Sequence, residues 1–210
     1  FIMECMIGIT FKDFVLLAAD MTAVQSIFVV KSDDIKLHKL SEHLVMAAVG
    51  ESGDKTQFAE YIAKNIQLYK MRNGYGLSPV AAANYTRRSL AEYLRSRTPY
   101  QVNMLMGGYD NEAGPVLYFI DYLAALVKIP YYAYGYGGYV SLSVIDRYYG
   151  KGDMTPEEGY ELLKKCVVEI QKRLVINLPN FQVQMICKDG IVYLPNITAK
   201  TLAVEETKAG

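Results

Sequence analysis

The predicted strands of this chain come in blocks separated by pairs of predicted helices, and this order restricts the fold more than any other feature. The pattern predicts five strands before residue 53, two helices up to about residue 98, three strands, two helices and two final strands. A parallel sheet would alternate single strands with single helices, whereas consecutive strands pair as antiparallel neighbours. The order therefore predicts an α+β fold, a four-layer αββα sandwich of two antiparallel sheets between helix pairs.

Short apolar runs mark the strands of the first block. Cys5–Phe11, Phe14–Ala19 and Leu44–Val49 are almost entirely apolar, a pattern typical of strands that are covered on both faces. Residues 26–31 and 35–40 have the β-branched or alternating character of two further strands. The other strands are expected at 101–107, 116–121, 124–129, 181–187 and 191–194.

Periodicity and capping residues mark the four helices. Residues 54–72 carry an apolar stripe at helical spacing. Ser78 followed by Pro79 predicts the start of the second helix, because serine caps free N–H groups and proline is favoured at the first helical position. A third helix is expected at about 139–149, after a glycine-rich turn. The capping box Thr155–Glu158 then opens the fourth helix.

No linker or internal repeat divides the chain, so residues 1–210 are expected to form a single domain. From Pro195 onward the residues are mostly small and polar. Residues 195–210 are therefore predicted to form a C-terminal extension, which either is disordered or docks on a neighbouring molecule.

Charge and cysteine content exclude several classes of function. Lys+Arg and Asp+Glu both number 22, so the formal net charge is zero, which argues against nucleic acid as a partner. No apolar run approaches the length of a membrane span. Cys5, Cys166 and Cys187 are too widely spaced to indicate a disulfide framework or a zinc site, and they favour a reducing compartment. His38 and His43 lie in separate predicted strands, so no metal site is expected.

Tyrosine is abundant: the chain has 18 Tyr, no Trp and 7 Phe. A tyrosine ring is apolar and its hydroxyl is polar, which suits surfaces that are buried against another protein. An ordinary core is the alternative. The stretches 131–139 and 148–149 are expected to lie in interfaces or in the cores that support them.

Several short strings resemble the beta subunits of the 20S proteasome, which have the N-terminal nucleophile hydrolase fold. Ala18–Asp20, Val49–Asp54 and Asn103–Asp110 carry the resemblance to the family. It covers about residues 3–195. Four further strings resemble the non-catalytic subunits at the fourth position of the beta ring, and these are Gln57–Ile62, Leu68–Tyr75, Leu94–Tyr100 and Ile120–Leu123.

The resemblance implies a catalytic site with most of its parts replaced. In active members a threonine at the mature N-terminus attacks the substrate, and its own amine is the base. Its supporting aspartate, lysine and pocket glycine correspond to Asp20, Lys36 and Gly50 here, but the threonine position falls on Glu4. A carboxylate in mid-chain cannot make that attack.

Three further positions depart from the pattern of active members. Met3 replaces the glycine that precedes the cleavage point, and Tyr136 replaces a supporting serine. The loop Leu174–Asn180 lacks the expected aspartate and serine. The expectation is that no residue is catalytic, that the chain is an inactive member of a threonine protease family, and that Asp20 and Lys36 form a structural ion pair.

Two alternatives involve other residues. An active hydrolase could use Cys5 or Thr10, but Cys5 is one residue out of register, so its thiol should point away from Asp20. Thr10 lies too far along the strand. A nucleotide-binding loop at 135–140 would need glycine where Val140 stands.

The resemblance also implies partners and a location. The expected partners are the other alpha and beta subunits of a 28-subunit particle, in the cytoplasm and the nucleus, where proteins are degraded. No cofactor, metal, nucleic acid or membrane is expected. Arg87, Arg88, Arg95 and Arg97 are interpreted as a solvated helix face or a subunit contact.

Overall fold

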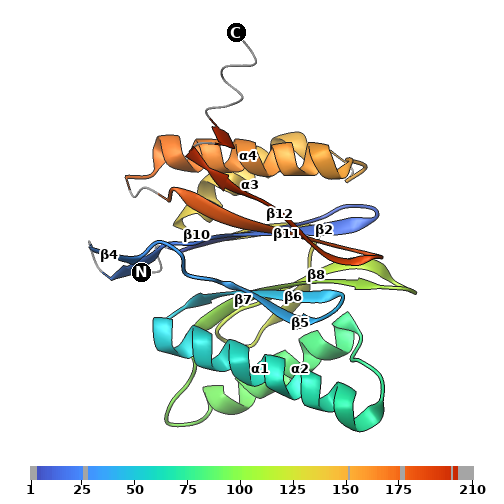
Figure 1. The fold of residues 1–210 in the computed structure, drawn as a ribbon. Coiled ribbons are helices and arrows are strands. Elements are labelled where there is room, and N and C mark those ends of the chain that lie inside the picture. The colour runs from blue at the N-terminus through green and yellow to red at the C-terminus, as the bar shows by residue number, and fades with distance from the viewer. Residues whose placement is uncertain (1–3, 26–27, 151, 176–177, 200, 203–210) are drawn as a thin grey trace.

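The chain folds into four layers, with two sheets stacked face to face and one pair of helices on each outer side (Figure 1). The computed structural model describes residues 4–25, 28–150, 152–175, 178–199 and 201–202. The predicted αββα sandwich is confirmed.

The first sheet is built mainly from the N-terminal and C-terminal parts of the chain. It has five antiparallel strands in the order β10-β1-β2-β11-β12. Their bounds are β1 (Cys5–Thr10), β2 (Phe14–Asp20), β10 (Tyr131–Gly135), β11 (Asn180–Cys187) and β12 (Gly190–Thr198). Helices α3 (Tyr136–Tyr148) and α4 (Pro156–Arg173) cover its outer face.

The second sheet is built from the middle of the chain. It is also antiparallel, in the order β5-β6-β7-β8-β9. Its strands are β5 (Leu37–Ser41), β6 (Leu44–Gly50), β7 (Val102–Asp110), β8 (Gly114–Ile120) and β9 (Leu126–Lys128). Helices α1 (Ser52–Asn73) and α2 (Pro79–Leu94) cover its outer face.

Three apolar layers fill the spaces between these elements. One lies between the first sheet and α3/α4, another between the second sheet and α1/α2, and the third between the two sheets. Strand alternation sends successive side chains to opposite layers. Cys5 and Ile7 of β1 pack toward α4, for example, while Met6 packs between the sheets.

The two helix starts predicted from capping residues are confirmed, whereas α1 and α3 begin two and three residues earlier than predicted. The Ser78 hydroxyl accepts a hydrogen bond from the Ala81 N–H at 3.3 Å. At α4 the Glu158 N–H donates to Thr155 Oγ1, and the Thr155 N–H donates to Glu158 at 2.9 Å. These side chains satisfy N–H groups that have no partner within the helix.

Three strand predictions need correction. Strand β10 was not predicted, because only Ala133 within it is fully buried and tyrosines fill most of the other positions. The strand expected at 26–31 is part of a hairpin of β3 (Ala23–Gln25) and β4 (Phe28–Lys31), and residues 26 and 27 lie outside the described residues. Strand β12 continues past Pro195 to Thr198, so the extension begins later than predicted.

The described helices were also compared with the requirements of a membrane span. None of them combines the necessary length with the necessary apolar character. Within the described part of the chain, no group of three or more His, Cys, Asp or Glu side chains is placed to hold a metal ion.

Candidate functional site

The start of β1 brings an acidic side chain into the space between the two sheets. Glu4 directly precedes β1 and lies two positions before Met6, which packs between the sheets. Side chains two positions apart share one face of a strand. Glu4 therefore extends toward the second sheet, where 12% of its side chain remains exposed.

Asp20 at the end of β2 forms a fully buried ion pair with Lys36. The Lys36 ammonium donates to Asp20 Oδ2 at 2.7 Å and to the Thr22 carbonyl at 2.8 Å. Asp20 also accepts the N–H groups of Cys5 at 2.7 Å and of Thr22 at 3.0 Å. Burial raises the pKa of the Asp20 carboxyl, while Lys36 and the two N–H donors act in the opposite direction.

Glu4 also contacts Lys36 and so extends the ion pair of Asp20 and Lys36 into a larger cluster. Its Oε1 lies 3.4 Å from the Lys36 ammonium and pairs with the Lys55 ammonium. Its Oε2 accepts the Gly50 N–H at 3.0 Å. The structure thus brings together Glu4, Asp20, Lys36 and Gly50, four of the five positions identified from the sequence.

Lys55 and Asp34 also belong to the cluster, and neither was predicted from the sequence. The Lys55 ammonium donates to Asp34 Oδ2 at 2.8 Å as well as to Glu4. Burial favours the neutral amine, but the carboxylates of Glu4 and Asp34 outweigh this and raise the pKa of Lys55. A signal was available, because a lysine in the first turn of a helix is disfavoured by the helix dipole and so requires a specific carboxylate partner.

The charged groups of the cluster bind one another, so few of them are left to bind a substrate. Three carboxylates and two ammonium groups are joined into one network by the contacts above. The Gly50 N–H, which could face a substrate oxygen, is used by Glu4. Thr22 supplies a hydroxyl nearby, but it is only 2% exposed. The arrangement is suited to holding the two sheets together.

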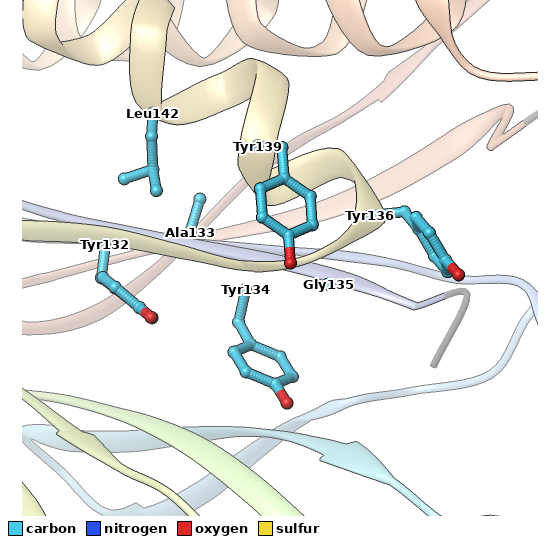
Figure 2. Close-up of a pocket in the computed structure, with 8 residues that line it drawn as sticks. Tyr132, Ala133, Tyr134, Gly135, Tyr136, Tyr139 and Leu142 are labelled. Atoms are coloured by element: carbon cyan, nitrogen blue, oxygen red, sulfur yellow. The ribbon is translucent and has the colours of Figure 1, made fainter. Parts of the chain in front are cut away.

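Tyr136, the fifth identified position, lies on the wall of a separate hollow. This cavity of about 440 Å³ is formed by β10 and the first turns of α3. Figure 2 shows Tyr132 and Tyr134 on the side of β10 that faces the second sheet, and Tyr136 pointing away from the other labelled tyrosines. Ring contacts to Phe119, with centroids 4.4 and 5.8 Å away, make Tyr132 and Tyr134 part of the core between the sheets.

The side chains of the two alternative nucleophiles are not part of the cluster's hydrogen-bond network. The Cys5 side chain is fully buried on the helix side of the first sheet, as its register predicts. Thr10 lies at the other end of β1, five residues further on, which is about 17 Å along an extended strand. Among the described residues, neither side chain forms a hydrogen bond with the Asp20 carboxylate, which accepts from these two residues only the backbone N–H of Cys5.

Cysteine reactivity gives a first prediction. Burial, with smaller effects of Asp20 and Cys166, raises the pKa of Cys5 well above its usual value, and burial raises the pKa of Cys166 to about 12. Brief treatment of the folded chain with iodoacetamide at neutral pH should therefore alkylate Cys187, which is only half-buried, and spare the other two. Peptide mass spectrometry reads the result, and a denatured sample labelled at all three positions is the control. Alkylation of Cys5 as fast as Cys187 would contradict the prediction.

A second prediction concerns His38 on β5, beside the cluster. Burial, followed by the nearby Lys55 ammonium, lowers the pKa of His38, and Asp34 and Glu60 only partly oppose this. As the pH falls through about 6.5, the unfolded chain binds a proton at this position before the folded chain does, so the free energy of unfolding falls. Urea unfolding between about pH 7.5 and pH 5.5 should show a smaller decrease for His38→Gln than for the unsubstituted chain. Equal decreases would refute a role for His38.

Comparisons with known proteins agree with the geometry. A family model described as proteasome subunit matches residues 3–186. Proteasome subunit beta type-2-B of Arabidopsis thaliana is 51% identical over 188 residues, which are 90% of this chain and 94% of that protein. Proteasome subunit beta type-4 of Saccharomyces cerevisiae is 45% identical over 199 residues, which are 94% of this chain and all of that protein.

Proposed function

The chain belongs to the proteasome subunit family, and on this premise we propose that it is a non-catalytic, structural beta-ring subunit of the 20S proteasome core. Its role is to complete the wall of the chamber in which proteins are degraded. It is part of a multi-subunit peptidase complex without itself cleaving peptide bonds. The similarity to beta type-2 and type-4 subunits over nine-tenths of the chain supports this placement.

The position of Glu4 is the observation that carries the proposal. A carboxylate stands where active relatives are expected to have a threonine, and Lys36, Lys55 and the Gly50 N–H all bind it. A carboxylate that is bound by two lysines has no hydroxyl to activate. In this proposal, Asp20, Lys36 and Gly50 stabilise the fold through their contacts within the cluster and take no part in catalysis.

The proposed partners are the other alpha and beta subunits of a 28-subunit particle. Obligate interfaces of this kind bury on the order of thousands of Å². The proposed location is the cytoplasm and the nucleus. Three cysteines that form no disulfide are compatible with such reducing compartments.

Native mass spectrometry of the particle that co-purifies with an affinity-tagged form of this chain tests the proposed assembly. The expected species has the mass of a complete core particle and releases this chain on activation in the gas phase. A tagged chain that is recovered only as a monomer, or in a complex without other proteasome subunits, would refute the proposal.

A further inference from the structure

A basic groove runs between α3 and α4 on the outer face of the molecule. The hollow has a volume of about 830 Å³. Five basic side chains and only two acidic ones line it, and they are Arg147, Lys164, Lys165, Lys172, Arg173, Glu161 and Glu169. The groove therefore has an excess of positive charge, in a chain whose formal net charge is zero.

The two acidic residues are already engaged. Glu161 pairs with Lys164 at 2.7 Å, and Glu169 pairs with Arg173 at 3.0 Å and with Lys172 at 3.7 Å. This leaves two cations on opposite helices, Arg147 on α3 and Lys165 on α4.

Arg147 and Lys165 are held over the same aromatic ring. The Arg147 guanidinium lies 5.3 Å and the Lys165 ammonium 4.5 Å from the centre of the Tyr148 ring. Within the described part of the chain, neither of the two forms an ion pair with a carboxylate. They form a preorganised pair of donors for an incoming anion.

Apolar side chains also line the groove, and one of them, Leu202, belongs to the C-terminal part of the chain. Val140, Val144 and Val168 line the hollow together with Leu202. Leu202 packs against the core beneath α3 and α4, so the backbone is anchored at the groove when it reaches residue 202. Reciprocal hydrogen bonds between Thr198 and Thr201 fix the turn that brings it there.

The residues after Leu202 carry apolar and acidic side chains, which complement the apolar and basic side chains of the groove. The sequence continues Ala203-Val204-Glu205-Glu206, which supplies one apolar side chain and then two carboxylates. Four extended residues reach at most about 14 Å. The groove-lining part of α4, from Glu161 to Arg173, is about 18 Å long, so a segment of this length fits within the groove.

We propose that the C-terminal segment 203–206 of this chain docks in the groove between α3 and α4, with Glu205 and Glu206 pairing with Arg147 and Lys165. Val204 then covers the valine wall. All parts of this docking site belong to one chain, so it does not depend on the assembly proposed above.

Zero-length cross-linking tests the docking directly. A carbodiimide joins a carboxylate to an amine only where the two are in contact, so treatment of the folded full-length chain should link Glu205 or Glu206 to Lys165. Mixing unlabelled chain with ¹⁵N-labelled chain distinguishes a link within one molecule from a link between two. The expected product is a link within one molecule, and its yield should fall in about 1 M salt, where charges are screened.

Matched substitutions sharpen the test. Arg147→Glu keeps the Lys165 amine but reverses the charge beside it, and should lower the yield of the link about fivefold. Arg88→Glu, the same change at another exposed position, on α2, should leave the yield unchanged. The proposal is overturned if the link is absent, if it forms only between molecules, which would make the groove a site for another chain, or if both substitutions have the same effect.

Discussion

Asp20→Ala is expected to lower the free energy of unfolding by about 3–5 kcal/mol, because it removes one partner of a fully buried ion pair. Lys36, which is 1% exposed, would lose its 2.7 Å contact, and the N–H groups of Cys5 and Thr22 would lose their acceptor. Glu4 cannot substitute fully, since it is 3.4 Å from Lys36 and is shared with Lys55. Urea unfolding of the full-length chain, followed by circular dichroism, measures the change.

Two further variants identify the cause of that loss. Glu60→Ala removes one partner of the exposed Glu60–Lys64 pair and should cost less than about 1 kcal/mol. The double variant Asp20→Ala, Lys36→Met removes both buried charges, so its cost should be smaller than the sum of the two single costs. A cost below about 1 kcal/mol for Asp20→Ala would show that the buried pair does not hold the sheets in place.

The second large effect is expected for Gly135→Ala, at the junction of β10 and α3. Gly135 has φ 89° and ψ −174°, a conformation that is essentially restricted to glycine. A Cβ at this position would lie 1.7 Å from the Glu4 carbonyl oxygen, so the start of β1 would have to move. The pairing of Cys5 with Gly135 would be disrupted as well. We expect a loss of at least about 3 kcal/mol in the free energy of unfolding.

Gly74→Ala is the matched control for backbone strain alone. Gly74 ends α1 with φ 79°, and a Cβ there would meet no atom within 4 Å. Its cost should be limited to the left-handed conformation, about 1–2 kcal/mol. Equal costs for the two glycine variants in urea unfolding would mean that the contact with Glu4 is unimportant.

Much of the site could be predicted because its residues lie at strand ends in a fixed register. Asp20 ends a continuous apolar strand, and Glu4 precedes the strand that pairs with it, so antiparallel pairing brings the two ends together. The parity of strand positions also accounts for Cys5 packing in the layer beside the helices while Met6 packs between the sheets. Local patterns of this kind determine the fold class, the helix starts and the direction of each strand's side chains.

What the sequence did not reveal depends on contacts between distant elements. Lys55 reaches Glu4 from a helix 51 residues away, and only the stacking of the two sheets brings them together. Strand β10 was missed because Tyr132 and Tyr134 do not form an apolar run, although their rings pack on Phe119 between the sheets. The exposed hairpin residues Phe28 and Val29 were predicted only as part of an ordinary strand.

In the proposed role, Glu4 occupies the position of the nucleophile, and the chain is expected to be unable to attack a substrate. The most direct test treats the assembled particle with a covalent, threonine-directed inhibitor and then measures the intact mass of every subunit. The account predicts that this chain keeps its mass while catalytic neighbours gain the mass of the inhibitor. An inhibitor adduct on this chain, on any of its residues, would contradict the account.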